Sequence, residues 1–138
     1  MFLLRGFIKF KFCRSPGWST GYADEQPGTS LSEGQFFAGG EMNLVIGVPN
    51  EDSLKGAVYV CKDCFNYYRQ EHIKVEGEMM GEGFGTATAA CDINNDNFDD
   101  LLVGAPTYSG SRNSRNVGRV HVFTNKAEGG TRSLISIK

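Results

Sequence analysis

The sequence has no long hydrophobic run, little histidine and almost no helical periodicity, and each shortage excludes a class of protein. None of its apolar stretches reaches eighteen residues, whereas a membrane-spanning helix needs about 20. There is no Gly-X-Y period, which excludes collagen. The only histidines are His72 and His121, and no set of nucleophile, base and orienting group is evident. We therefore predict a protein that is not an enzyme and has no small-molecule substrate.

Charge is distributed unevenly along the chain. The whole sequence carries 14 Lys and Arg against 16 Asp and Glu, but residues 1–20 hold four basic side chains and no acid. The remainder is therefore mildly acidic, which disfavours nucleic acid as a partner. The basic side chains Arg5, Lys9 and Lys11 also interrupt the apolar N-terminus, and a secretory signal needs an unbroken apolar core. We predict no signal peptide there and leave residues 1–15 unassigned.

Glycine, by contrast, is abundant and marks the ends of short apolar segments. The chain has 18 glycines among 138 residues, roughly double the usual share of about 7%. Short runs rich in β-branched residues and bounded by Gly, Pro, Asn and Asp indicate strands. We predict strands over residues 44–48, 57–61, 84–91, 101–105 and 119–123, with a further strand near 72–75.

Two of these segments repeat one another. The sequence LVIGVP at 44–49 aligns with LLVGAP at 101–106, and each is followed by a polar loop and then by G-x-V-x-V. Repeats that each contain several strands are typical of propeller blades or similar arrays. Gly47 and Gly104 lie inside apolar strands, which indicates close backbone approach.

The four cysteines leave alternatives open. Cys61 and Cys64 form one C-x-x-C pair, but a zinc site needs a second pair or suitably spaced histidines. We favour a small disulfide loop between them, with two thiols of no special role as the alternative. Cys91 ends an apolar strand, and we expect it to be a buried small residue.

The sharpest motif is the acidic loop DINNDNFDD at 92–100. Oxygen-bearing side chains stand at its first, third, fifth and ninth positions, and calcium prefers six to eight oxygen ligands. We expect a calcium site whose ligands are Asp92, Asn94, Asp96, the carbonyl of Phe98, and Asp100. Asp99 is expected to point away.

This loop is not an EF-hand, although its first half fits the pattern D-x-[DN]-x-[DN]. The sixth position is Asn97 rather than Gly, and the twelfth is Val103 rather than a bidentate Glu. The predicted flanks are strands and not helices. The motif therefore predicts a strand–loop–strand site, and its alternative is a solvated loop without metal.

The residues around this loop resemble a known family. The stretch 77–106, with Phe84-Gly85, the acidic loop and then LVGAP, is similar to an FG-GAP repeat, and together with VGRVHVF at 117–123 it resembles the head of an integrin α-subunit. The preceding copy, GQFFAGGEMNLVIGVP at 34–49, is similar to the adjoining blade but has no acidic loop. The resemblance implies an all-β fold of antiparallel β-propeller blades, about two of the seven blades of such a head.

The resemblance also implies a domain division and a function. Residues 16–76 would form a blade without a calcium loop and residues 77–126 a blade with one, while 127–138 stay an unassigned tail. The parent protein would be a cell-surface adhesion receptor that pairs with an integrin β-subunit, binds matrix or cell-surface ligands and signals through them. Its ligand-facing loops would be 50–55 and 107–117, with contact candidates Tyr108, Arg112 and Arg115.

Two further expectations follow from the short repeat count. A propeller needs about 4–8 blades to close, and only two are recognisable, so the chain is expected to be a fragment that folds poorly or associates by itself. The alternative function is a secreted FG-GAP protein, such as the propeller of a phospholipase or a lectin-like binder.

Overall fold

The structure, a computed structural model, describes residues 30–62, 72–110, 116–128 and 131–137. They form two four-stranded antiparallel sheets, each with its strands in sequence order. The predicted all-β class and the two blade-like sheets are therefore confirmed. The first sheet comprises β1 (Ser30–Gly34), β2 (Asn43–Val48), β3 (Ala57–Cys61) and β4 (His72–Glu76), and the second comprises β5 (Ala87–Cys91), β6 (Asp100–Ala105), β7 (Arg119–Glu128) and β8 (Thr131–Ile137).

The predicted strands correspond to six of these eight elements. The segments 44–48, 57–61, 72–75, 101–105 and 119–123 lie in β2, β3, β4, β6 and β7. The segment 84–91 is extended only from Ala87, because Gly85 has a φ of +92° and the N–H of Thr86 bonds to the carbonyl of Gly83. That combination makes a turn before the strand. Neither β1 nor β8 was predicted, and β8 occupies most of the tail that the sequence left unassigned.

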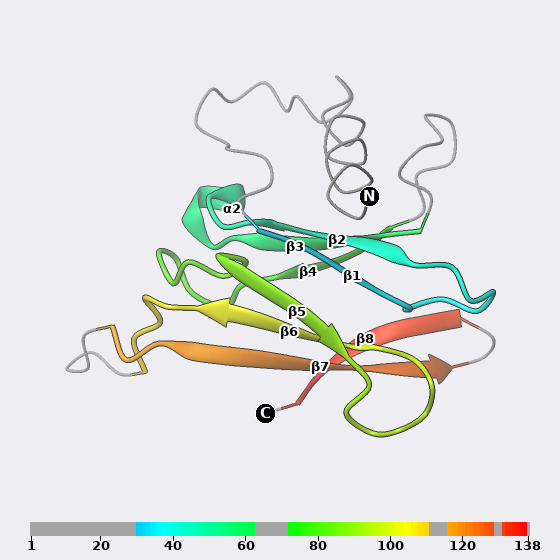
Figure 1. The fold of residues 1–138 in the computed structure, drawn as a ribbon. Helices are drawn as coiled ribbons and strands as arrows, with labels where there is room; N and C mark the ends of the chain where they lie inside the picture. Colours follow the sequence, from blue (N-terminus) through cyan, green and yellow to red (C-terminus); the bar gives the residue numbers. More distant parts are fainter. Residues whose placement is uncertain (1–29, 63–71, 111–115, 129–130, 138) are drawn as a thin grey trace, which may run out of the picture.

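The two sheets pack against each other through β5, which lies along β1 and β2 (Figure 1). The core between them is a single cluster of apolar side chains from both sheets and from the segments before β2 and β5. Phe36 and Phe84 are its largest fully buried side chains. Burying one such side chain contributes about 1.5–3 kcal/mol, so the aromatic residues in these two connecting segments do much to hold the sheets together.

The strand registers of the two sheets are equivalent. Gly47 of β2 lies opposite Ser30 on one side and Val58 on the other. Gly104 of β6 lies in the same way between Ala87 and Val120. The repeat seen in the sequence is therefore a repeat of structure, residue by residue, across three adjacent strands.

Candidate functional site

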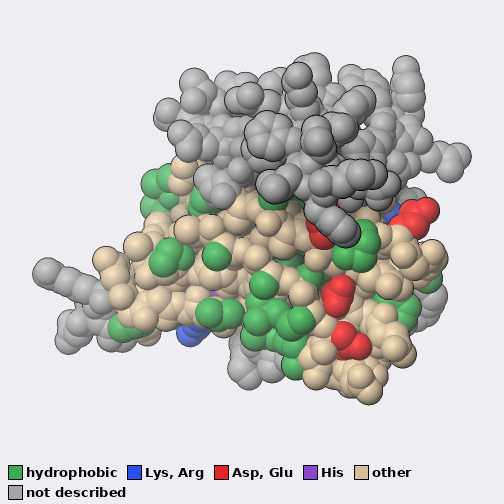
Figure 2. Space-filling view, in the orientation of Figure 1, with side chains coloured by type: hydrophobic (Ala, Val, Ile, Leu, Met, Phe, Trp, Pro, Cys, Tyr) green, Lys and Arg blue, Asp and Glu red, His purple; other side chains and the backbone are tan. Residues whose placement is uncertain are grey.

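The acidic loop connects β5 to β6 at one end of the second sheet. Residues 93–97 are exposed, Asp92 and Phe98 are half-buried, and Asp100 is fully buried at the start of β6. Figure 2 shows acidic side chains at the lower right, over this end of the sheet, next to hydrophobic ones. The predicted strand–loop–strand setting is thus present.

Two of the predicted ligands, Asp92 and Asn94, converge on the backbone amide of a third, Asp96. The N–H of Asp96 donates to Oδ1 of Asp92 at 3.1 Å and to Oδ1 of Asn94 at 3.0 Å. The amide Nδ2 of Asn94 lies 3.4 Å from Oδ2 of Asp96. Because two side-chain oxygens bond to one N–H, the structure brings Asp92, Asn94 and Asp96 together on one side of the loop.

The turn that makes this convergence possible depends on two asparagines. Asn95 has a φ of +61° and Asn97 a φ of +68°, in the left-handed region that Asn tolerates better than most side chains. The N–H of Asn97 then donates to Oδ2 of Asp92 at 2.8 Å, and the N–H of Phe98 donates to Oδ1 of Asp96 at 2.9 Å. Asn97 thus takes the left-handed turn for which an EF-hand uses glycine.

Asp100 has a different role from the other three side chains. Its Oδ2 accepts a hydrogen bond from the N–H of Ile93 at 3.0 Å, and its Oδ1 accepts one from the N–H of Asn125 in β7 at 2.8 Å. The buried carboxylate therefore ties the loop to the sheet. Each oxygen retains a second lone pair, since a carboxylate has about four acceptor positions.

The donor chemistry of the loop fits calcium, since every candidate is a hard oxygen and the loop is built from short turns. In the structure these side chains accept hydrogen bonds from the loop's own backbone amides. Among the residues that the structure describes, no three His, Cys, Asp or Glu side chains lie together as a metal cluster. The loop brings Asp92, Asn94 and Asp96 together, and Asp100 bonds instead to the backbone of Ile93 and Asn125.

Asp99 points away from the loop, in the direction of the first sheet. Its Oδ2 accepts a hydrogen bond from the N–H of Gln35 at 2.7 Å, and its own N–H donates to the carbonyl of Gln35 at 2.9 Å. The side chain of Asn125 adds bonds to the carbonyls of Phe36 and Asp99. No local pattern indicated that Asp99 connects the two sheets, because its partner is distant in the chain.

The structure corrects one candidate for ligand contact. Tyr108 is only 8% exposed and belongs to the apolar core, with the guanidinium of Arg119 3.7 Å from its ring centroid. Its ring is therefore enclosed and does not face a ligand. Arg112 and Arg115 lie outside the described residues.

The other loop expected to face a ligand, 50–55, contains the short turn-like segment α2 (Glu51–Leu54), in which the last three residues have positive φ. Its Glu51 belongs to an ionic cluster with residues of β3 and β4. Lys74 of β4 lies 2.9 Å from Oε1 of Glu51 and 2.6 Å from Oε1 of Glu76. Partial burial opposes its charge, but hydrogen bonds to Glu76 and Glu51 outweigh this and raise the pKa of Lys74. The hydrogen bond between Lys74 and Glu76, together with the positive charge of Lys74, lowers the pKa of Glu76.

Tyr59 completes this cluster. Its hydroxyl donates a hydrogen bond to Oε1 of Glu51. Burial, and then this hydrogen bond, raise the pKa of Tyr59 to about 12. The cluster thus joins α2, β3 and β4 by groups whose charge states are coupled.

A buried acid–base pair was not anticipated. Glu82 is 1% exposed and His121 5%, and Oε2 of Glu82 lies 3.6 Å from Nε2 of His121. Neither atom has a hydrogen-bond partner among the residues that the structure describes. The other carboxylate oxygen of Glu82 accepts from the N–H groups of Glu78 and Met79. The sequence showed an acidic residue before Phe84 and a histidine in a predicted strand. No local pattern indicated that these two side chains would lie next to each other.

The cysteines differ in part from expectation. Cys61 is disulfide-bonded, while Cys64 lies outside the described residues, so the predicted pairing stays a prediction. Cys91 is free and exposed, which corrects the expectation of a buried residue. It shares the outer face of β5 with Ala87 and Ala89, since alternate residues of a strand face the same side. That face is turned away from the first sheet.

Comparisons with known proteins point to one family. The model of the FG-GAP repeat matches residues 84–123. Integrin alpha-IIb of Homo sapiens is 39% identical over 108 residues, which cover 74% of this chain and 10% of that protein. Integrin alpha-8 of Mus musculus is 32% identical over 105 residues, with shares of 74% and 10%, and integrin alpha-PS2 of Drosophila melanogaster is 33% identical over 104 residues, with shares of 72% and 7%.

These matches cover most of this chain but only a small part of each relative, since the chain spans about a tenth of the length of the integrins named above or less. In the described ranges no helix is long and apolar enough to cross a membrane. The matched repeat contains the acidic loop, β6 and the first half of β7. By its two sheets, its FG-GAP repeat and its relatives, the chain belongs to the integrin α-subunit family, as a fragment of the FG-GAP head.

Proposed function

We propose that this chain forms part of the head of an integrin α-like adhesion receptor at the cell surface, where calcium binds the loop of the second sheet. The relatives are integrin α-subunits, which favours a receptor over a secreted FG-GAP protein. The observation that carries the calcium proposal is the convergence of Asp92 and Asn94 on the N–H of Asp96.

Calcium would stabilise the loop by relieving repulsion between carboxylates. Two like charges in close contact repel by about 1–4 kcal/mol at the dielectric constants of a protein surface. Asp92, Asn94, Asp96, the carbonyl of Phe98 and Asp100 would hold the ion, which in turn would hold β5 and β6 in register. The proposed role of the ion is structural, and the chain's own contribution is to place these oxygens on one loop.

The test is the effect of calcium on unfolding of the full chain. With a dissociation constant of about 10⁻⁴–10⁻³ M, as in extracellular modules, about 10 mM calcium should add roughly 1.4–2.7 kcal/mol of stability. Asp96→Ala should abolish this increment. Asp96 suits the test because its side chain is exposed, whereas Asp100 is buried and bonded to two backbone amides.

Asp52→Ala provides a matched control, because Asp52 is exposed and lies in α2, which connects β2 and β3 of the first sheet. It should retain the full calcium response. Equal calcium shifts in wild type and Asp96→Ala would show that the ion, if bound, lies elsewhere. If calcium did not change the stability of the chain at all, the calcium proposal would be wrong, and the loop would be a hydrogen-bonded turn without a metal.

The partners in this proposal are an integrin β-subunit and an extracellular ligand. The loops 50–55 and 107–117 are the proposed contact surfaces, with Arg112 and Arg115 as contact residues. Replacing both arginines by Ala should weaken capture of a purified β-subunit ectodomain or a matrix ligand by the immobilised chain. Unchanged capture of both would remove these two residues from the proposal.

A further inference from the structure

Each of the two sheets ends in an outer strand that, within the part of the chain that the structure describes, pairs on one side only. β4 ends the first sheet beside β3, and β8 ends the second sheet beside β7 (Figure 1). The outer edge of such a strand presents a row of backbone N–H and C=O groups, which is a template for pairing with another strand. Whether another strand pairs there depends on the side chains along the edge.

The edge of β4 is protected by charge. Two of its five residues are Lys74 and Glu76, and Nζ of Lys74 lies 2.9 Å from Oε1 of Glu51 and 2.6 Å from Oε1 of Glu76. Charged side chains, above all lysine, discourage a further strand from pairing at an edge. A strand laid along β4 would have to accommodate this ionic cluster.

The edge of β8 has little of this protection. The strand is seven residues long, and its sequence TRSLISI contains one charged residue, Arg132, and no proline. Leu134 packs against the apolar core, while Ile135 is 38% exposed and faces the opposite side, since side chains alternate along a strand. A long edge strand with so few charges is a surface at which another strand can pair.

The order of residues along β8 suits pairing with a second copy of the same strand. Two identical antiparallel strands are related by a twofold axis, so each copy uses the same surface. An axis at Leu134 pairs all seven residues, because Leu134 is the middle of the strand. It places the two Leu134 residues opposite each other and Arg132 opposite Ser136 of the second copy. The two arginines are thereby kept apart, whereas like charges directly opposite each other would destabilise the pair.

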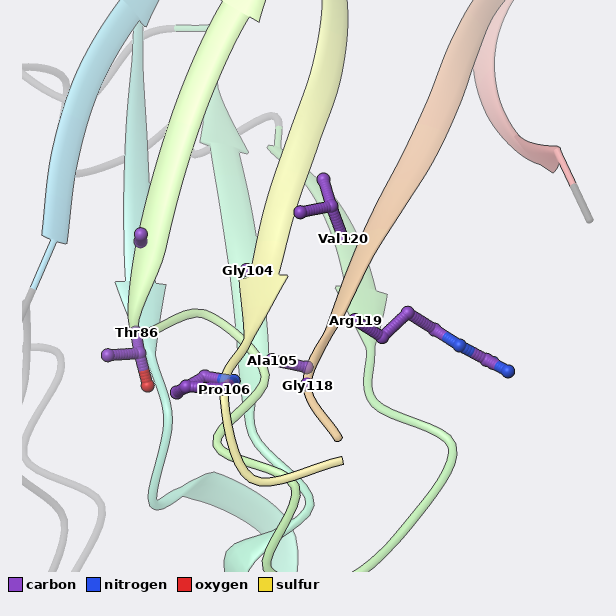
Figure 3. Close-up of a pocket in the computed structure, with 8 residues that line it drawn as sticks. Thr86, Gly104, Ala105, Pro106, Gly118, Arg119 and Val120 are labelled. Atoms are coloured by element: carbon purple, nitrogen blue, oxygen red, sulfur yellow. The ribbon is translucent and has the colours of Figure 1, made fainter. Parts of the chain in front are cut away.

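The second sheet also has an open apolar pocket, which is separate from this edge. The pocket is lined by the turn before β5 and by β5, β6 and the start of β7, with Gly104 and Val120 among its residues, and no described residue of β8 lines it (Figure 3). Val120 is 61% exposed there. Pairing through β8 would leave the pocket open, so substitutions can distinguish the two surfaces.

We propose that β8 is an interaction edge through which two copies of this chain pair antiparallel, with the twofold axis at Leu134. The two second sheets would then join into one continuous sheet. Main-chain hydrogen bonds along the strand supply the affinity in pairing of this kind, and the side chains at the contact supply the specificity. The proposal depends neither on the receptor function nor on calcium.

The test is sedimentation equilibrium of the full chain over a range of concentrations, which measures the dissociation constant of the dimer. Ser136 is exposed, and each copy of it would lie opposite an Arg132. Ser136→Glu should therefore tighten the dimer and Ser136→Lys should weaken it, each by about 2- to 30-fold, because two cross-strand charge pairs change together. The net charge of the chain is −2, so general repulsion between copies would produce the opposite order.

Val120→Lys is the matched control, since it introduces the same charge as Ser136→Lys in the pocket. It should leave the dissociation constant unchanged. A chain that stays monomeric at millimolar concentration would overturn the proposal, as would Ser136 variants that fail to shift the constant in opposite directions. A dimer that only Val120→Lys dissociates would belong to the pocket, and the proposal would be wrong.

Amide hydrogen exchange of the wild-type chain provides a second arm. Exchange in residues 131–137 should slow as the concentration rises through the dissociation constant, because pairing covers the outer edge of β8. Exchange in residues 72–76 should not change, since β4 stays an outer edge in the dimer. Slower exchange in β4 alone, or equally in both strands, would show that the copies pair in another way and would contradict the role given to β8.

Discussion

Gln35 and Asp99 join the two sheets by a reciprocal pair of hydrogen bonds, although they lie 64 positions apart in the chain. The backbone N–H of Gln35 donates to Oδ2 of Asp99 at 2.7 Å, and the N–H of Asp99 donates back to the carbonyl of Gln35 at 2.9 Å. One of the two bonds has a charged acceptor, and such bonds are stronger than neutral ones. This pair of hydrogen bonds holds the C-terminal end of the acidic loop, residues 92–100, against the first sheet.

Asp99→Ala should therefore destabilise the whole molecule. A hydrogen bond to a charged group contributes about 1.5–3 kcal/mol, and the N–H of Gln35 would lose its carboxylate partner. Urea unfolding followed by circular dichroism measures the loss. Asp52→Asn is the control, since the side chain of Asp52 forms a surface pair with Lys55 and Asn tolerates the positive φ of this position, so its stability should stay within about 0.5 kcal/mol of wild type. Equal effects of the two variants would contradict the role given to Asp99.

Gly47→Ala and Gly104→Ala should differ sharply, although the sequence repeat makes the two positions equivalent. A Cβ at Gly47 would lie 2.1 Å from the carbonyl oxygen of Gly85, whereas the nearest atom to a Cβ at Gly104 is Cβ of Ala87 at 3.3 Å. Overpacking should cost Gly47→Ala about 1–3 kcal/mol or more. Gly104→Ala should change stability by less than about 1 kcal/mol, because a shift of a few tenths of an ångström in the backbone of β5 relieves the 3.3 Å contact. Both are measured by urea unfolding, and similar losses would contradict the observed packing.

Glu82→Ala should be costly and Glu82→Gln much less so. The carboxylate oxygen Oε1 accepts hydrogen bonds from the N–H groups of Glu78 at 2.6 Å and Met79 at 3.3 Å. Removing it leaves these amides without that acceptor, at a cost of about 1–3 kcal/mol. Gln keeps an oxygen for both amides and presents an amide group to Nε2 of His121. Thermal unfolding measures the stability of the two variants. A Glu82→Gln variant as unstable as Glu82→Ala would contradict the role given to the carboxylate oxygen.

Stability should fall at alkaline pH because folding raises the pKa of both Tyr59 and Lys74. A raised pKa means that the folded state holds its proton more tightly than the unfolded state, so the contribution is complete below the unfolded values of about 10–10.4. For Tyr59 it is lost as pH rises from there through about 12. Melting temperatures should therefore stay level from pH 8 to about 10 and decline from there to pH 12.

Tyr59→Phe isolates one part of this decline. The variant should lose less stability than wild type over the same pH range, since its ring has no proton to release. Lys55→Ala, a change at an exposed surface pair, should leave the pH profile unaltered. A profile for Tyr59→Phe that follows wild type throughout would remove Tyr59 from the explanation.

Local patterns in the sequence were sufficient for the strands and for the repeat. The alternation in 57–61 and 119–123 places valines on one face, because side chains alternate along a strand. The acidic loop could also be predicted, because Asp and Asn favour turns and tolerate a left-handed backbone, and these preferences act within a few residues. The two strands that were missed, β1 and β8, have weak patterns of their own and are ordered by pairing with β2 and β7.

The sequence by itself determined the repeat, the turns and the supply of oxygen ligands, because these depend on residues close together in the chain. Only the tertiary structure decided which of two equivalent residues in the repeat is buried. Val58 is buried and Val120 exposed, and Gly47 is crowded while Gly104 borders an open pocket. Tyr108 is buried and Cys91 exposed for the same reason. The surroundings of each depend on where a second sheet packs, and no local pattern carries that information.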